Sequence, residues 1–397
     1  AFYIAGTGRP GPVLIDIPMD VQKAVVDFEY PEKCEIRSYK PTTKGNYVQV
    51  RRVMAALEEA EKPLICIGGG VFAAHAENEI RELADLMQIP VITTMMGISV
   101  FPDDDQLFCG MIGTHGVKMA NAAVNECDVL FLVGARVGDR AVKTPLALEK
   151  TTKIIHIDID PAEIGKNIGA DLPLVGDAKL VLQQMAELAK PMKHDEWIAH
   201  IKTLGGEREY VEPANGTVNP RVFIDRLAKK MPANVTVVAD VGQNQIWTCT
   251  EYKFRKEGRL LTSGGMGTMG YSVPAAIGAK MADNSRATVA ICGDGAFQMS
   301  FMELATAVQF GVDIKVVVMT NNRLGMVREL QTNGYHDRQT AVFLDGSPDF
   351  IKLAEAYGIP AMRVYDDATM EKGVEMLAEH KGICLVEVVV DKDMPTL

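Results

Sequence analysis

Short buried strands alternate with helical segments along most of this chain, and this alternation restricts the possible fold more than any other feature. The first expected strands, at residues 64–68, 90–94, 129–133 and 153–158, are dominated by Val, Ile and Leu. Apolar runs of this kind are typical of strands buried on both faces, and helical connections allow neighbouring strands to run parallel. The sequence therefore predicts an α/β protein with parallel sheets that are covered on both sides.

Two Rossmann-like blocks are expected. The first occupies residues 31–190, with helices predicted at 76–87, 117–126 and 178–188. The second occupies residues 219–397, and its strands are expected at 235–239, 288–292, 314–320 and 383–390. Its first helix should start at Pro220 after Asn219, because Asn is a favoured N-cap and Pro a favoured first helical residue.

The segments outside these blocks have a different character. Residues 191–218 are polar and have no clear strand period, so they are interpreted as a linker. Residues 1–30 begin as the end of a helix, a Pro/Gly turn and a strand, and they are interpreted as the C-terminal remnant of a preceding domain. The chain is therefore expected to be a fragment of a longer protein.

Composition excludes several classes of function. Acidic residues outnumber basic ones by 52 to 41, which gives a net charge of −11 without a Lys/Arg cluster, so neither nucleic acid nor a membrane is an expected partner. No apolar stretch reaches the roughly 18 residues that a membrane span needs. The seven cysteines include no C-x-x-C pair and lie mostly in apolar runs, which indicates the reducing cytoplasm.

The segment Gly293-Asp294-Gly295, followed by Asn321 and Asn322, carries the clearest chemistry. It is predicted to be a turn at the carboxyl end of one strand, then a helix with Phe297, Phe301, Leu304, Ala305 and Val308 on a single face, then a second strand. Helix N-termini bind phosphate, and an aspartate among phosphates requires a cation between them. One carboxylate, one carboxamide and phosphate oxygens suit Mg²⁺, and both turns should meet at one edge of a parallel sheet.

The same segment resembles the diphosphate-binding half of thiamine-diphosphate enzymes, as does SGGMGTMGYSVPAAIGAK (263–280). More narrowly, RPGPVLIDIP, GTHG, GARVGDR, HIDIDPAEIGKN, DVGQNQIW and NNRLGMV resemble the acetolactate synthase (acetohydroxyacid synthase) large-subunit family, in family order along the whole chain. The resemblance implies a central domain of the FAD or deoxyhypusine-synthase type, followed by a thiamine-diphosphate-binding domain. It starts at the tail of the family's N-terminal pyrimidine-binding domain.

The resemblance assigns roles to individual residues. The metal ligands would be Asp294, the side chain of Asn321 and the backbone carbonyl of Arg323, with Asn322 as the alternative amide. Met269 would support the cofactor as a catalytic residue, and Arg140 would bind the carboxylate of the second keto acid. The thiamine-diphosphate contacts implied are Val241, Gly242, Gln243, Asn244, Gly267, Met269, Gly293, Gly295, Ala296, Gly325 and Met326.

The first block is implied to bind FAD. The turn Gly68-x-Gly70 follows a strand and opens a helix, but the acidic residue that an NAD site places about 20 positions later is missing. The FAD contacts implied by the resemblance are Arg37, Gly69, Thr94, Met95, His115, Gly134, Arg136, Asp158, Ile159, Asp177 and Ala178.

The activity implied is the condensation of two pyruvate molecules to 2-acetolactate with loss of CO₂, a step of branched-chain amino acid biosynthesis. Leu330 and Thr114 replace a Trp and a Met that are common in the family, which predicts only a weak preference for 2-ketobutyrate as the second substrate. Implied partners are a second large subunit, in a dimer or tetramer, and a regulatory small subunit. The activating glutamate would come from the absent pyrimidine domain, so the chain alone is expected to be inactive and to bind thiamine diphosphate weakly.

Three alternatives stay open at this point. The chain could come from a pyruvate oxidase or another thiamine-diphosphate carboligase, which flavin reduction by pyruvate would reveal. It could be a nucleotide-binding module of the dehydrogenase or deoxyhypusine-synthase type. It could also be a non-catalytic assembly or regulatory fragment.

Overall fold

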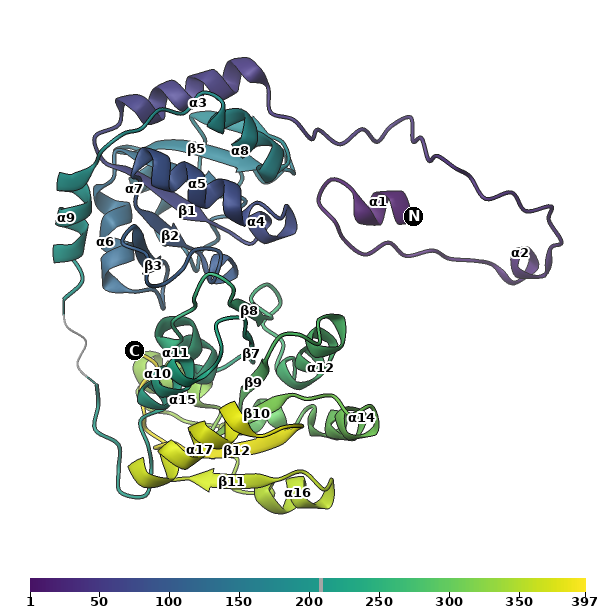
Figure 1. Ribbon diagram of the computed structural model, residues 1–397, viewed down its shortest axis with the longest axis vertical. Helices are drawn as coiled ribbons and strands as arrows, with labels where there is room; N and C mark the ends of the chain where they lie inside the picture. The colour runs from purple at the N-terminus through teal and green to yellow at the C-terminus, as the bar shows by residue number, and fades with distance from the viewer. Residues whose placement is uncertain (207–209) are drawn as a thin grey trace. The chain divides into compact units, whose positions relative to one another are not determined.

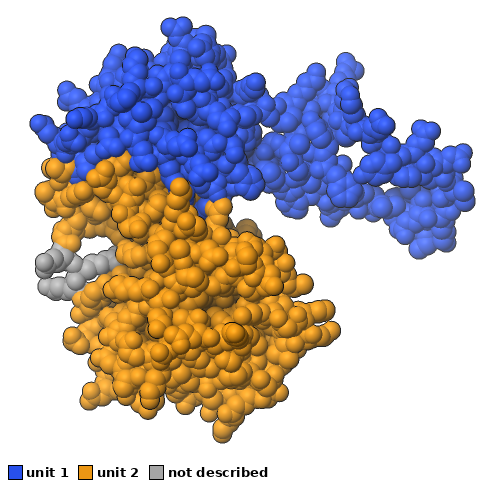
Figure 2. All heavy atoms as spheres, viewed as in Figure 1, with its two compact units in different colours: residues 1–90, 124–198 blue, residues 91–123, 199–397 orange. Residues whose placement is uncertain are grey.

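A computed structural model describes residues 1–206 and 210–397 of the chain. The chain divides into two compact units, residues 1–90 with 124–198 and residues 91–123 with 199–397 (Figure 2). Part of the expected linker, residues 207–209, lies outside the described residues. Among the described residues, none of the helices combines the length and the apolar character that crossing a bilayer requires.

The first sheet has six strands in the order β3-β2-β1-β4-β5-β6, and its neighbours run parallel (Figure 1). Its strands are β1 (Pro63–Ile67), β2 (Val91–Thr93), β3 (Phe108–Met111), β4 (Val129–Val133), β5 (Lys153–Asp158) and β6 (Leu172–Val175). The helices in this part of the chain are α3 (Tyr47–Glu59), α4 (Gly70–Ala73), α5 (Glu77–Met87), η1 (Met95–Gly97), α6 (Lys118–Glu126), α7 (Pro145–Leu148), α8 (Ala178–Ala186) and α9 (Asp195–Thr203).

The second sheet also has six parallel strands, in the order β11-β12-β10-β9-β7-β8. They are β7 (Thr236–Ala239), β8 (Arg259–Thr262), β9 (Thr288–Gly293), β10 (Lys315–Thr320), β11 (Ala361–Val364) and β12 (Cys384–Val389). The helices are α10 (Pro220–Lys230), α11 (Gln243–Glu251), α12 (Ser272–Ala282), α13 (Asp294–Phe297), η2 (Phe301–Glu303), α14 (Leu304–Gln309), α15 (Gly325–Gly334), α16 (Phe350–Ala356) and α17 (Asp367–Glu379).

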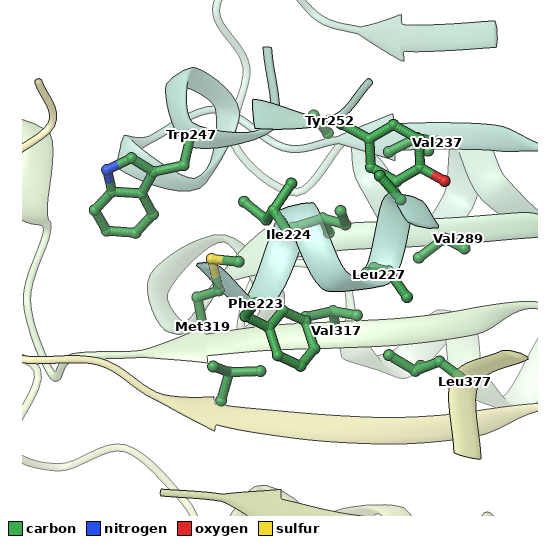
Figure 3. Close-up of a cluster of buried hydrophobic side chains, with 14 of the residues drawn as sticks. Phe223, Ile224, Leu227, Val237, Trp247, Tyr252, Val289, Val317, Met319 and Leu377 are labelled. Carbon is green, nitrogen blue, oxygen red and sulfur yellow. The ribbon is translucent and has the colours of Figure 1, made fainter. Parts of the chain in front are cut away.

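Helices cover both faces of the second sheet, because alternate residues of each strand point to opposite sides. One apolar cluster joins Val237, Val289 and Val317 to α10, α11 and α17 (Figure 3). The other joins the intervening residues, such as Val238 and Val318, to α12, α14 and α16. Burial on both faces leaves only the two ends of the strands open, and the carboxyl end is where a ligand site is expected.

The expected α/β fold with two parallel sheets is confirmed. The predicted strands of both blocks are present to within a residue or two. Asn219 caps α10 as expected, since its side chain accepts a hydrogen bond from the Arg221 backbone N–H (2.9 Å). The linker segment contains α9, a helix that buries Trp197 and Ile201.

Two local predictions are wrong. The single helix expected after residue 293 is broken into α13, η2 and α14, so the helical phase restarts near residue 300. Ala305 and Val308 are therefore exposed, and Ala307 is buried instead. The strand expected within residues 9–18 is also not formed, because this exposed segment pairs with no strand in the described part of the chain. The short helices α1 (Phe2–Gly6) and α2 (Met19–Lys23) lie on either side of it.

Candidate cofactor and metal site

A cavity of about 180 Å³ opens at the carboxyl edge of the second sheet. The chain leaves β7 and β9 there, and the sheet order changes direction between these two neighbouring strands. Open α/β sheets bind their ligands at such switch points, because the connections on either side diverge and leave a crevice. The walls of this cavity are the turns after β7, β9 and β10, together with the first residues of α11, α13 and α15.

Asp294 supplies the negative charge of this cavity. It is 1% exposed, and its two carboxylate oxygens accept backbone hydrogen bonds from Gly295 (2.8 Å), Asn321 (3.2 Å) and Asn322 (2.6 Å). Burial raises the pKa of this carboxyl to about 6, and the three backbone hydrogen bonds only partly oppose that rise. No Lys or Arg side chain among the described residues pairs with Asp294. A buried carboxylate that has no cationic partner is suited to binding a metal cation.

Asn321 lies beside Asp294 at the end of β10. Its side-chain oxygen accepts a hydrogen bond from the Arg323 backbone N–H (3.1 Å), and its amide group donates to Gln243 (3.3 Å). Asn322, the alternative amide, has a left-handed backbone with φ of 54° and uses its own N–H to bind Asp294. The residues expected to hold the metal are thus brought together from two turns, Asp294 from the one after β9 and Asn321 and Arg323 from the one after β10. The described residues contain no group of three or more His, Cys, Asp or Glu side chains that could hold a metal, so other ligands would have to be amide, carbonyl or phosphate oxygens.

Glycines at the cavity wall leave backbone N–H groups, rather than side chains, facing a ligand. Gly242 precedes α11 with φ of +139°, a conformation that strongly favours glycine. A Cβ atom added at Gly325 would lie 1.9 Å from Oε1 of Gln243, so this position also requires a small residue. The free N–H groups at the starts of α11 and α15 both border the cavity, and they suit a phosphate group. The donor set and the buried carboxylate therefore fit a Mg²⁺-bound diphosphate.

The sequence analysis did not single out Asp240, which lies behind the cavity lining and holds part of it in place. Asp240 is fully buried, and its carboxylate accepts hydrogen bonds from the backbone N–H groups of Gly270 (3.0 Å) and Ser272 (2.7 Å). It thereby fastens the turn that carries Met269 to the end of β7. Met269 lines the cavity, and its Cε is 3.3 Å from where a Cβ of Gly295 would be. The position of Asp240 directly after a buried strand is the sequence feature that could have identified it.

Most of the residues expected to contact thiamine diphosphate line this one cavity. They are Val241, Gly242, Gln243, Asn244, Met269, Gly293, Gly295, Ala296, Gly325 and Met326. Leu330, expected at the substrate, lines it as well, whereas Gly267 does not. The cavity walls also include residues that the sequence analysis did not name as contacts, namely Trp247, Met319, Leu324, Val327 and Val390.

The expected FAD contacts fall into three groups. At the carboxyl edge of the first sheet, at or just after the ends of its strands, lie Gly69, Gly134, Arg136, Asp158, Ile159, Asp177 and Ala178. There the turns at Gly68 and Gly134 approach so closely that a Cβ at Gly68 would lie 2.2 Å from the Gly134 carbonyl oxygen. Arg37 lies before α3. Thr94 and Met95 follow β2, and His115 lies in the loop after β3. Of the residues expected at the second substrate, Arg140 lies in an exposed turn of the first unit and Thr114 in the loop after β3.

Comparison with known proteins agrees with this geometry. Residues 240–388 match the C-terminal TPP-binding domain of thiamine pyrophosphate enzymes, and residues 50–185 match the central domain of these enzymes. The fold and the site thus define a thiamine pyrophosphate enzyme.

Its nearer relatives are acetolactate synthases. The chain is 42% identical to the "Probable acetolactate synthase large subunit" of Methanocaldococcus jannaschii, over 98% of the chain and 68% of that protein. It is 40% identical to the acetolactate synthase of Arthrospira platensis, over 99% of the chain and 70% of that protein. It is 41% identical to the acetolactate synthase large subunit of Corynebacterium glutamicum, over 92% of the chain and 60% of that protein. The chain therefore belongs to the acetolactate synthase large-subunit family, and it spans between 60% and 70% of the length of these three relatives.

Proposed function

We propose that the protein is a thiamine-diphosphate- and Mg²⁺-dependent acetolactate synthase, which joins two pyruvate molecules to 2-acetolactate and releases CO₂. The observation that supports this most directly is the buried carboxylate of Asp294, which lies beside Asn321 and has no cation partner among the described residues. Family membership supplies the reaction, and the cavity supplies a place for the diphosphate and its metal.

In this proposal Asp294, the Asn321 side chain and the Arg323 carbonyl hold Mg²⁺. The starts of α11 and α15 hold the phosphate oxygens by backbone N–H groups. When bound, thiamine diphosphate supplies the stabilised carbanion chemistry that allows a 2-keto acid to lose CO₂ and form a new carbon–carbon bond. The chain's own residues orient the cofactor, and Asp240 keeps the Met269 turn in place beneath it.

The apolar side chains of the cavity would exclude water. Trp247 is buried and its indole N–H donates to the Pro395 carbonyl (3.1 Å), which fixes the ring in the cavity wall. Leu330 is 60% exposed at the cavity edge, and a smaller side chain than Trp there would discriminate weakly between pyruvate and 2-ketobutyrate. Arg140 and Thr114 are proposed contacts of the second substrate.

Further parts of the proposal come from the family resemblance. FAD would be held at the carboxyl edge of the first sheet, where Gly69, Gly134 and Asp158 lie at the ends of three adjacent strands. Residues 31–190 would be the FAD-type domain and residues 219–397 the diphosphate-binding domain. A second large subunit, a regulatory small subunit and a cytoplasmic location are also proposed. The 397 residues assayed alone are expected to be inactive, since the resembled enzymes take their activating glutamate from a pyrimidine domain.

Calorimetric titration of the chain with thiamine diphosphate, with and without Mg²⁺, tests the binding part of the proposal. We expect saturable binding only with Mg²⁺, and we expect Asp294→Ala to abolish it while the surface control Asp225→Asn leaves it unchanged. Metal-independent binding, or binding that survives Asp294→Ala, would contradict the proposed site. Formation of acetolactate by the whole protein tests the reaction, and reduction of bound flavin by pyruvate would instead favour an oxidase.

A further inference from the structure

The side-chain amide of Gln243 connects the cofactor cavity with residues that lie behind its wall. Gln243 opens α11, is buried and lines the cavity, and its Oε1 accepts a hydrogen bond from the Asn321 amide (3.3 Å). Its Nε2 donates to the Met394 carbonyl (2.9 Å), the Thr396 hydroxyl (3.2 Å) and the Glu329 carboxylate (3.3 Å). These three acceptors do not line the cavity themselves, so their contact with the site is indirect.

The acceptors around Nε2 determine which end of the Gln243 amide faces Asn321. A backbone carbonyl and a carboxylate can only accept hydrogen bonds. The Thr396 hydroxyl donates its single proton to the Glu329 carboxylate, so it also acts as an acceptor toward Gln243. Turning the amide over would place Oε1 against three acceptors. The oxygen of Gln243 is therefore held toward Asn321.

The orientation of Gln243 in turn determines which end of the Asn321 amide is available to a metal. The amide oxygen of an asparagine can bind a cation, whereas its NH₂ group carries only donors and repels one. Because Oε1 of Gln243 accepts from Nδ2 of Asn321, the NH₂ end is occupied there. Oδ1 accepts the Arg323 backbone N–H (3.1 Å), and the second lone pair of an amide oxygen suffices for a metal.

We infer that Glu329 is a positioning residue for the proposed metal site, acting through Gln243 on Asn321. Its carboxylate takes the proton of the Thr396 hydroxyl and also accepts the Thr396 backbone N–H (3.2 Å), which fixes residues 394–396 against the Gln243 amide. Hydrogen bonds behind a metal ligand orient that ligand and contribute to metal affinity. The inference rests on the proposed function, since it assumes that Asp294 and Asn321 hold Mg²⁺.

Calorimetric titration of the full chain with Mg²⁺, in the presence of thiamine diphosphate, tests this role. Glu329→Ala frees the Thr396 hydroxyl to donate to Oε1 of Gln243, so the amide can turn over. We expect Mg²⁺ to bind about tenfold more weakly, as is typical when a hydrogen bond behind a metal ligand is lost. Glu329→Gln keeps an acceptor oxygen and should restore binding close to that of the wild type. The matched control Glu375→Ala removes an exposed glutamate on α17 and should bind like the wild type.

An Asn321→Asp background separates the orientation of the ligand from a general loosening of the structure. A carboxylate presents oxygen at both ends, so aspartate at this position binds Mg²⁺ without being oriented. Adding Glu329→Ala to Asn321→Asp should therefore cause no further loss of Mg²⁺ affinity. If Glu329 only kept residues 394–396 in place, its removal would weaken Mg²⁺ binding equally in both backgrounds.

The outcomes distinguish this inference from the proposed function. Unchanged Mg²⁺ affinity in Glu329→Ala, or an equal loss in the Asn321→Asp background, overturns the role of Glu329 and leaves the proposed metal site intact. Absence of Mg²⁺-dependent binding in the wild type overturns the proposed site, and this inference with it. Should Asn321→Asp fail to fold, the two Glu329 variants decide, because equal losses in Glu329→Gln and Glu329→Ala also overturn the inference.

Discussion

Replacing the carboxylate of Asp294 should change how the stability of this protein depends on pH. Burial raises the pKa of Asp294 from its ordinary value of 3.8 to about 6. The folded state therefore keeps a proton on this group that the unfolded chain releases at lower pH. The contribution of Asp294 to stability is fully present below pH 3.8 and is lost as the pH rises through 6. Two pKa units correspond to about 3 kcal/mol of unfolding free energy, lost by about pH 7.

Asp294→Asn removes this titration while keeping the size of the side chain. Its amide places an N–H group among the three backbone donors that now bind the carboxylate, which costs about 1–3 kcal/mol at every pH. That cost shifts the whole stability curve without changing its shape. Subtracting the variant's curve from that of the wild type therefore isolates the ionisation of Asp294, and other titrating groups cancel.

Urea unfolding between pH 4 and pH 8, in EDTA, measures the difference. We expect the wild type to lose about 3 kcal/mol relative to Asp294→Asn across this range. Asp225→Asn, at a partly exposed position on α10, should instead follow the wild type. Parallel curves for the wild type and Asp294→Asn would refute the reasoning, because the buried carboxyl would then not be the group that titrates.

Added metal should reverse this loss. A cation at Asp294 neutralises the buried carboxylate, and a ligand that binds only the folded state raises its stability by mass action. Mg²⁺ with thiamine diphosphate is therefore expected to raise the melting temperature of the wild type above pH 6, less so below it, and to leave Asp294→Asn unchanged. Equal stabilisation of both proteins would place the metal elsewhere.

Four further substitutions have expected outcomes. Gly325→Ala should weaken thiamine-diphosphate binding about tenfold in calorimetry, because the new Cβ would displace Gln243, whereas Gly278→Ala, with no atom within 4 Å, should raise the unfolding free energy by about 1 kcal/mol. His156 is 1% exposed and burial lowers its pKa, so the wild type should lose stability as the pH falls below about 6.5, and His156→Leu should flatten that part of the urea-unfolding profile. Leu330→Trp in the whole protein should raise the preference for 2-ketobutyrate about ten- to a hundredfold in a competition assay; an unchanged product ratio would remove Leu330 from the specificity site.

The sequence by itself determined the strands and the spacing of the site residues. Continuous apolar runs such as residues 129–133 can be satisfied only in a sheet that is covered on both faces, so local composition sufficed to place them. The start of α10 after Asn219 follows from short-range hydrogen bonding, which the sequence also reveals. Asp294 and Asn321 could be paired because parallel strands bring their carboxyl ends to one edge.

Only the tertiary structure decided which other groups share that site. Asp240 binds the backbone of residues 270 and 272, about 30 positions away, and backbone donors leave no trace in a sequence. The break after α13, which shifted the buried face of the following helix, depends on packing between distant elements rather than on apolar spacing.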